Sequence, residues 1–184
     1  MKNTLIALVT SLFFGSAAFA AEIDVEKSSI KWIGTKVTGS NHYGLISPKP
    51  SELTLKDGKV VSGNVVIDMT TITVTDITDS ERAAKFLRHM MNEDFFEVNK
   101  FPTATLAIKE SKDGKMMGDL TIKGVTKPFS FPVTFKDGKY LGKTTFDRTK
   151  YGVIYRSGNF FQDLGDKIIN DDVEIEFEIV VKGE

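Results

Sequence analysis

Side chains that commonly carry catalysis are scarce in this sequence. It contains two histidines, His42 and His89, and no cysteine. The two histidines lie far apart, so neither a close His pair nor a Cys pair is available for zinc. A Ser-His-Asp arrangement is recognised by geometry and stays open on spacing, but no Gly-x-Ser-x-Gly elbow is present. We expect no catalytic residue, no cofactor and no enzymatic activity.

Four aspartates gather near the C-terminus, at Asp163, Asp166, Asp171 and Asp172. Carboxylate oxygens are typical calcium ligands, so a calcium loop is one interpretation. The spacing does not match an EF-hand loop, which favours a solvated acidic loop. We therefore predict no metal site.

The first 20 residues have the features of a secretory signal peptide. Lys2 supplies a positive charge, an apolar run follows, and small residues stand at Ala18 and Ala20. The apolar run is shorter than the roughly 20 residues that a membrane-spanning helix needs, which disfavours an anchor. We predict cleavage after Ala20 and a single mature domain over residues 21–184. Export of a chain without cysteine fits a bacterial periplasm.

The charge balance excludes one class of partner. The whole chain has 24 basic and 25 acidic residues, and removal of the leader takes away one basic residue, Lys2. Binding to nucleic acid depends on clustered Lys and Arg, so this composition gives no reason to expect it. We expect no stable membrane span either, and a homodimer stays open.

Apolar and polar residues alternate through much of the mature chain. In a strand, side chains point to opposite faces in turn, so each such segment has one apolar face. Val61, Val65, Ile67 and Met69 are assigned to one face on this basis. The alternating segments are residues 30–32, 61–69, 106–108, 120–122, 129–135 and 173–181.

Short turn signals separate these segments. Asp57-Gly58, Asp113-Gly114 and Asp137-Gly138 each stand between two strand-like runs. Asp-Gly readily supplies the positive φ angles of tight hairpin turns, so each pair predicts a β-hairpin. The result is an antiparallel meander of about eight strands, as found in barrels and sandwiches.

One segment has helical rather than strand periodicity. Thr78-Asp79-Ser80-Glu81 resembles a capping box in which the Thr hydroxyl caps the helix start. Apolar residues then recur at helical spacing up to Met91. We predict an amphipathic helix from about Asp79 to Met91, inserted between strands.

The direction of the apolar face stays ambiguous on pattern alone. A soluble barrel turns this face inward, whereas an outer-membrane barrel turns it toward lipid. The inserted helix needs an apolar surface to cover, and several strands fall short of the roughly 9–11 residues that cross a bilayer, so the soluble form is favoured. An eight-stranded interior is either filled by side chains or holds one ligand, and the 14 phenylalanines fit both outcomes.

Three motifs resemble those of the YceI-like family. Asp94-Phe95-Phe96-Glu97-Val98, followed by Lys100-Phe101-Pro102, resembles its Asp-Phe-Phe-Asp-x-x-x-Tyr-Pro signature. The run from Gly118 to Pro128 resembles its Gly-x-Leu-Thr-x-x-Gly-x-Thr-x-Pro segment, and Arg148-Thr149-Lys150-Tyr151-Gly152 resembles its Arg-x-x-Phe-Gly element. The order and spacing agree, and the similarity spans nearly the whole mature chain.

The resemblance implies both a fold and a function. The implied fold is all-β: an antiparallel up-and-down, lipocalin-like barrel of about eight strands with one inserted helix and an apolar interior. The implied function is periplasmic binding, sequestration or transport of a polyisoprenoid or isoprenoid-quinone lipid. An enzyme acting on an isoprenoid substrate is the alternative.

One segment departs from the family pattern. The family usually has Arg-Asp-x-His-Leu just before Asp-Phe-Phe, whereas this chain has Phe86-Leu87-Arg88-His89-Met90. Replacing a charged pair by two apolar residues makes the helix more apolar. Whether a ligand head group or a partner is the same as in other members therefore stays open.

Strand residues of inward parity are the candidates for the cavity wall, and residues near the helix are the candidates for its mouth. Ordinary core packing is the alternative for each. Arg148 or Arg156 is the candidate for a phosphate or quinone oxygen, because Arg presents a planar fork of donors; a solvated surface arginine is the alternative. The wall candidates are Trp32, Val65, Ile67, Met69, Leu106, Leu120, Ile122, Phe129, Phe131 and Phe177, and the mouth candidates are Phe86, Met90, Phe95 and Tyr151.

Overall fold

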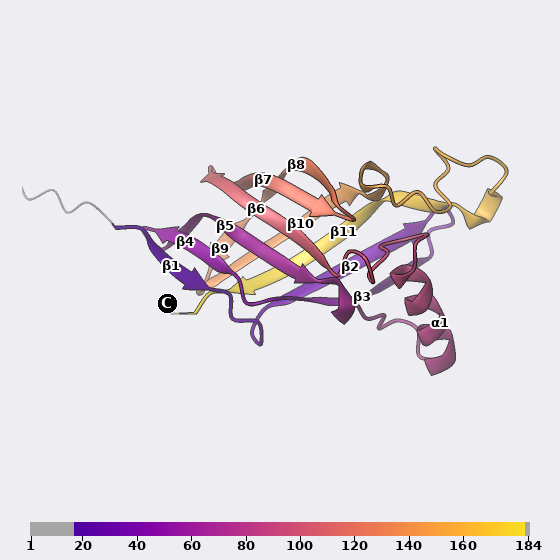
Figure 1. Ribbon diagram of the computed structural model, residues 1–184, viewed down its shortest axis with the longest axis horizontal. Helices are drawn as coiled ribbons and strands as arrows, with labels where there is room; N and C mark the ends of the chain where they lie inside the picture. Colours follow the sequence, from indigo (N-terminus) through magenta and orange to yellow (C-terminus); the bar gives the residue numbers. More distant parts are fainter. Residues whose placement is uncertain (1–16, 183–184) are drawn as a thin grey trace, which may run out of the picture.

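The computed structural model describes residues 17–182 as one antiparallel sheet wrapped into a barrel, with one α-helix (Figure 1). Helix α1 spans Ser80–Met91, and the short 3₁₀ helices η1, η2 and η3 span Met69–Thr71, Arg148–Tyr151 and Gly165–Lys167. The strands are β1 Phe19–Glu22, β2 Ser29–Lys36, β3 Asn41–Pro48, β4 Glu52–Lys56, β5 Lys59–Asp68, β6 Thr103–Lys112, β7 Lys115–Ile122, β8 Val125–Pro132, β9 Thr134–Lys136, β10 Lys139–Asp147 and β11 Ile169–Val180.

The sheet order is that of an up-and-down barrel. Along the sheet the order is β8-β7-β6-β5-β3-β2-β11-β10-β9, with β4 paired to β5 and β1 paired to β4. The last strand, β11, pairs antiparallel with β2, so the two ends of the chain's meander meet. This arrangement confirms the predicted antiparallel barrel with one inserted helix.

The barrel is nearly rather than fully closed. Strands β8 and β10 lie against each other, but no ladder joins them within the described part of the chain. Pro128 and Pro132 leave β8 without two backbone N–H donors, and proline in a sheet is confined largely to edge strands. The seam therefore follows from the sequence of β8.

The three predicted Asp-Gly hairpins are confirmed. Asp57 and Gly58, for example, have φ values of 52° and 69°, and the other two pairs have similar angles. A fourth tight turn, Lys123-Gly124, has φ values of 49° and 75° and joins β7 to β8. Lys before Gly is a weaker hairpin signal than Asp before Gly, which is why the sequence pattern does not reveal this turn.

The prediction that Val61 shares the buried face of β5 with Val65 and Ile67 is wrong. Val60, not Val61, is buried against the core. Between β4 and β5, Leu55 pairs with Val60 and Thr54 pairs with Ser62, so Val61 is an extra residue in a β-bulge. A bulge switches the face to which the following side chains point, and a simple alternating pattern in the sequence does not reveal it.

Helix α1 lies where the sequence predicts it, but its cap differs. Asp79 is the N-cap, and its carboxylate accepts a hydrogen bond from the backbone N–H of Arg82. The predicted cap by Thr78 is therefore wrong by one residue, since Asp79 offers an equally suitable oxygen next to the first turn. None of the helices in residues 17–182 is long and apolar enough to span a membrane.

The predicted leader lies mostly outside the described residues. Phe19 and Ala20 are described and belong to β1, which pairs with β4. Cleavage after Ala20 would remove these two residues and leave Ala21 and Glu22 in the strand. The cleavage site stays a prediction.

Candidate functional site

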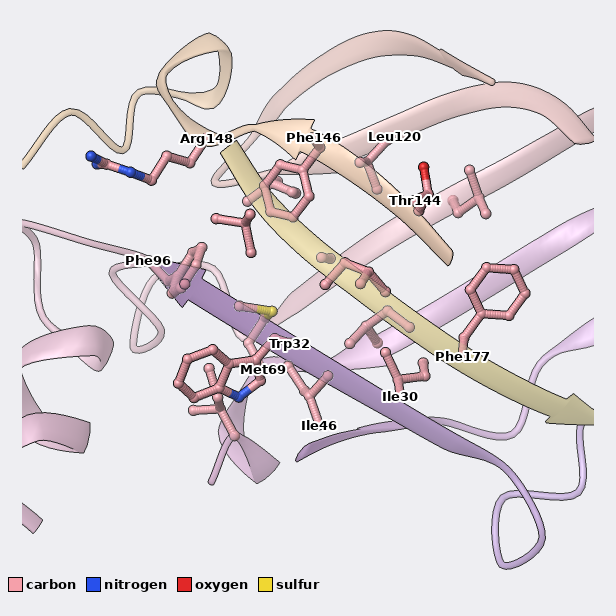
Figure 2. Close-up of a pocket in the computed structure, with 18 of the residues that line it drawn as sticks. Ile30, Trp32, Ile46, Met69, Phe96, Leu120, Thr144, Phe146, Arg148 and Phe177 are labelled. Carbon is pink, nitrogen blue, oxygen red and sulfur yellow. The ribbon is translucent and has the colours of Figure 1, made fainter. Parts of the chain in front are cut away.

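A cavity of about 400 Å³ runs inside the barrel. Figure 2 shows side chains from several strands turned toward this common space. Near one end its wall includes Tyr140 and Ile179, and at the other it reaches α1 and the connection between β10 and β11. Its volume lies within the range typical of ligand pockets, and most of its lining side chains are apolar.

The structure brings almost all of the predicted apolar site residues together around this cavity. Every wall candidate lines the cavity, as do Phe86 and Met90 on α1 and Phe95 just after it. Tyr151 is the exception, because its ring is buried in η2 and packs edge-on against Phe146, with centroids 5.9 Å apart. The candidates that line the cavity are Trp32, Val65, Ile67, Met69, Phe86, Met90, Phe95, Leu106, Leu120, Ile122, Phe129, Phe131 and Phe177.

Aromatic rings form much of the wall. Phe131 stacks on Phe129 and meets Phe177 edge-on, with centroids 5.5 Å apart in both pairs. The ring of Phe86, on α1, lies nearly parallel to the Trp32 ring, with the ring centroids 6.3 Å apart. Phe86 belongs to the segment that departs from the family pattern, so this departure adds an aromatic ring to the cavity.

Sequence reasoning missed part of the wall, including most of β10. Tyr140 and Phe146 face the cavity, and Thr144 lies between them on the same face. Gly142 completes that face, where a Cβ atom would come within 2.3 Å of the Phe177 ring. Because two small residues interrupt the apolar pattern, alternation did not mark β10 as a wall strand. Other missed apolar wall residues are Ile30, Ile46, Leu53, Val60, Ile72, Phe96, Ala104, Ile108, Met116, Ile169, Val173, Ile175 and Ile179.

Polar groups are concentrated at the end of the cavity near α1, which we call the rim. The charged residues among the described lining residues are all basic, and no aspartate or glutamate lines the cavity. The rim consists of Thr35, Lys36, Ser40, His42, His89, Tyr155, Arg156 and Asn170.

His42 is held in place by a carboxylate behind it. Its Nδ1 lies 2.7 Å from Oδ2 of Asp76, whose Oδ1 accepts a hydrogen bond from the Tyr43 N–H. Burial acts to raise the pKa of Asp76, but the hydrogen bonds from Tyr43 and His42 outweigh it, so the pKa lies below its ordinary value. The His42 ring also packs against Phe86, at 4.8 Å.

His89 presents an unpaired polar atom. Its Nε2 is buried and has no hydrogen-bond partner within residues 17–182. Its Nδ1 lies 3.3 Å from the amide nitrogen of Asn92, which can only donate, and 3.9 Å from Oδ2 of Asp94, which is beyond hydrogen-bond distance. The hydrogen-bond geometry therefore favours Nε2 as the protonated nitrogen of a neutral ring. The ring is enclosed by Phe95 and Tyr155, at 5.2 and 4.5 Å. Since an unpaired buried polar group is costly, this N–H is suited to a ligand oxygen.

Both predictions for Arg148, a head-group contact and a solvated surface arginine, differ from what the structure shows. Its side chain is neither solvated nor free to hold a ligand, because it is only about 1% exposed and donates to the backbone oxygens of Val153, Ile169 and Asn170 and to Asp171. Arg148 is among the residues that line this end of the cavity, but in Figure 2 its guanidinium extends away from the other labelled side chains. Burial lowers the pKa of Arg148, and the carboxylates of Asp171 and Asp147 partly oppose that shift. Arg148 fixes the connection between β10 and β11.

Arg156 remains the basic head-group candidate. It lies at the rim with its guanidinium over the Tyr155 ring, 5.1 Å from the centroid. Its backbone φ of 50° is unusual for a residue other than glycine, and its backbone oxygen accepts a hydrogen bond from Ile169. The guanidinium makes no ion pair in the described part of the chain.

Asp171 also differs from the expectation of a purely solvated acidic loop. Its carboxylate accepts hydrogen bonds from Arg148, Ser157 and Asn159. Within residues 17–182, no group of three or more His, Asp or Glu side chains is arranged to hold a metal ion. The acidic cluster thus contains one structural carboxylate.

Comparison with known proteins gives matches in both sequence and structure. A family model described as "YceI-like domain" matches residues 22–181. A UPF0312 protein of Pseudomonas putida strain W619 is 29% identical over 151 residues, which cover 76% of either chain. A UPF0312 protein of Pseudomonas fluorescens is 27% identical over 174 residues, covering 83% of this chain and 88% of the relative.

Two solved structures share the fold. BcnA of Burkholderia cenocepacia matches with a TM-score of 0.61 and 20% identity, over 88% of this chain and 99% of its own. A domain from Saccharophagus degradans, described as a polyisoprenoid binding domain implicated in plant cell wall breakdown, matches with a TM-score of 0.62 and 13% identity, over 92% and 100%. At these identities the matches establish a common barrel.

Proposed function

Because this chain belongs to the YceI-like domain family and its barrel encloses a long apolar cavity, we propose that it binds an isoprenoid lipid and sequesters or transports it in the periplasm. The observation that carries the proposal is the distribution of polarity. Apolar side chains line the length of the cavity, and polar groups gather at the rim. A long hydrocarbon tail with one polar end has the same distribution.

The size of the hydrophobic effect supports a long apolar ligand. Burial of one CH₂ group contributes about 0.8 kcal/mol, so one five-carbon isoprene unit contributes about 3–4 kcal/mol. Non-covalent affinities saturate near 18–21 kcal/mol, so several buried units suffice for tight binding. The aromatic wall around Phe131 provides the surface for such contacts.

The polar end of the ligand is expected at the rim. A tail inserted from that side would place its head group near the Nε2–H of His89 and the guanidinium of Arg156. Both groups are donors, so they favour an oxygen acceptor such as a phosphate or a quinone carbonyl.

The proposed location rests on the sequence of the first 20 residues and on the lack of cysteine. Fractionation of cells that express the full chain tests it. We expect the mature protein in the periplasmic fraction with Ala21 as its first residue by N-terminal sequencing. Retention of the leader in cytoplasmic protein would contradict this location.

Organic extraction of the purified protein followed by mass spectrometry tests the ligand. We expect an intact isoprenoid in the native protein. Phe131→Asp places an unpaired charge in the wall and should abolish retention, whereas Phe135→Asp, at a position that is 40% exposed, should keep the lipid. A folded Phe131→Asp variant that keeps its lipid would refute the cavity assignment.

A second variant covers the case in which Phe131→Asp does not fold. Leu120→Trp keeps the wall apolar and fills part of the cavity (Figure 2). We expect this variant to fold and to carry less lipid than the native protein. Conversion of an added isoprenoid by the native protein would instead support an enzyme.

A further inference from the structure

The connection between β10 and β11 exposes two neighbouring phenylalanines. Phe160 is 55% exposed and Phe161 is 45% exposed, and they lie in the segment 157–164, which we call the aromatic loop. Single exposed apolar residues are ordinary on protein surfaces. Two adjacent aromatic rings on a loop next to a cavity call for a physical explanation.

The aromatic loop is held in a defined conformation. Ser157 is buried, and its hydroxyl donates to Asp171, which also accepts from Asn159. The backbone oxygen of Ser157 accepts from the N–H groups of both Phe160 and Phe161. Because Arg148 fixes Asp171 in turn, the loop presents the two rings from a hydrogen-bonded base.

The aromatic loop lies at the rim of the cavity. Tyr155 and Arg156, just before it, line the cavity, and Figure 1 shows this connection and α1 at the same end of the barrel. Val37, another exposed apolar residue, donates its N–H to the oxygen of Ile168 just after the loop. Exposed apolar side chains therefore border the end of the cavity that carries the polar rim.

We propose that Phe160, Phe161 and Val37 form a docking surface for a lipid bilayer. This inference rests on the proposed function. Insertion of the rings into the membrane interface would bring the rim against the bilayer, so that an isoprenoid tail passes between membrane and cavity without crossing water. The docking surface borders the rim, because Lys36 precedes Val37 and Tyr155 and Arg156 precede the aromatic loop, and all three line the cavity. Since the proposed ligand of that cavity is a lipid, this position points to a lipid bilayer rather than a protein as the partner.

The charges near the loop indicate how this surface binds. Residues 156–167 contain two basic residues, Arg156 and Lys167, and two acidic ones, Asp163 and Asp166, and Lys36 beside Val37 adds one positive charge. One excess positive charge gives only a small attraction to anionic lipids, so binding depends mainly on apolar insertion. Two inserted rings provide weak and reversible binding, which suits a protein that exchanges its lipid with a membrane.

Vesicle flotation tests the docking surface. The native protein, the double variant Phe160→Ser/Phe161→Ser and the control Phe135→Ser are mixed with phosphatidylcholine vesicles. We expect the native protein and the control to float with the vesicles, and the double variant to bind about tenfold or more weakly. High salt should change the binding of the native protein little. Equal binding of the double variant and the native protein would overturn the proposal.

Two parallel measurements separate this inference from the proposed function. Lipid extraction of the same proteins tests the cavity: a native protein that holds isoprenoid but does not float overturns only the docking surface. Conversely, a native protein that floats through Phe160 and Phe161 but holds no isoprenoid overturns only the proposed function. Sedimentation velocity tests a second copy as the partner. A dimer that the double variant dissociates, with vesicle binding unchanged, would reassign the surface and overturn bilayer docking.

Discussion

Two regions of this protein are built on opposite principles. The cavity wall is apolar and leaves space in the middle of the barrel. The connection between β10 and β11 contains a buried arginine, Arg148, whose hydrogen-bond partners are three backbone oxygens and Asp171. The cavity wall leaves space unfilled and has few polar groups that need hydrogen-bond partners. Around Arg148 the buried side chains are polar, and they are paired with other protein groups.

This difference separates binding from stability. In the wall, unfilled space lowers stability but is available to a ligand. Around Arg148 and Asp171, the buried polar side chains are paired with protein groups, so these side chains offer little for a ligand to contact. Two arginines eight residues apart illustrate this contrast: Arg148 is committed to the backbone, and Arg156 faces the rim.

The largest effect is expected from Arg148→Met. This change removes the ion pair with Asp171 and the donor to three backbone oxygens, and breaking a buried ion pair typically costs about 3–5 kcal/mol. The free energy of unfolding from urea titrations should fall by about that amount. Arg156→Met is the matched control and should change it by less than about 0.5 kcal/mol. Equal losses would show that the two arginines do not differ in role.

The next largest effect on stability is expected from a larger side chain placed in the filled core rather than in the cavity. Leu120 lines the cavity, whereas Leu55 is fully buried away from it. Overpacking a filled core costs about 1–3 kcal/mol, so Leu55→Trp should destabilise the lipid-free protein by that amount. Leu120→Trp should cost clearly less, because its ring enters empty space. Similar losses at both positions in thermal unfolding would mean that the wall is packed like an ordinary core.

The apolar wall was largely predictable from the sequence, since strand parity is a local property. Phe129, Phe131 and Phe177 face the cavity as their alternation indicates. Parity failed at Val61, where a bulge interrupts β5, and on β10, where Gly142 and Thr144 hide the pattern. Both failures come from features that depend on a neighbouring strand.

The polar connection was not predictable in the same way. Arg148 lies next to Asp171 only because β10 and β11 pair, and no spacing rule relates residues 23 apart in a loop-rich segment. The sequence therefore predicted that Arg148 is solvated or binds a ligand, whereas in the fold Arg148 is buried. The same holds for His89, whose unpaired Nε2 depends on how α1 meets Tyr155.

A smaller effect is expected at the rim. His89→Phe keeps an aromatic ring but removes the Nε2–H donor. A typical hydrogen bond contributes about 0.5–1.5 kcal/mol, so affinity for an isoprenoid quinone should fall about two- to tenfold. Affinity for squalene, a hydrocarbon without a head group, should stay the same when both are measured by displacement of a fluorescent lipid. A parallel loss for squalene would assign His89 to packing.

The smallest effect is expected from Asp76, which orients His42 at the rim. Its pKa in the folded protein lies below the ordinary value of 3.8, because the hydrogen bonds from Tyr43 and His42 to its carboxylate outweigh the effect of burial. A lowered pKa stabilises the fold above pH 3.8, and this contribution is lost as the pH falls through the folded-state pKa. Asp76→Asn should therefore lower the free energy of unfolding by up to about 1 kcal/mol at pH 7 and by progressively less below pH 3.8.

Subtracting the urea titrations of the native protein and Asp76→Asn at each pH isolates this carboxylate, since the other acids are common to both proteins. A difference that stays constant down to the lowest pH at which both proteins fold would show that the charge of Asp76 contributes nothing. If the difference instead disappears with acid while the lipid is still retained, the Asp76 carboxylate behind His42 contributes to stability and the apolar wall alone holds the tail. In that case the end of the cavity near α1 would follow the same rule as the rest of the molecule: its polar groups stabilise the fold, and the apolar wall binds the ligand.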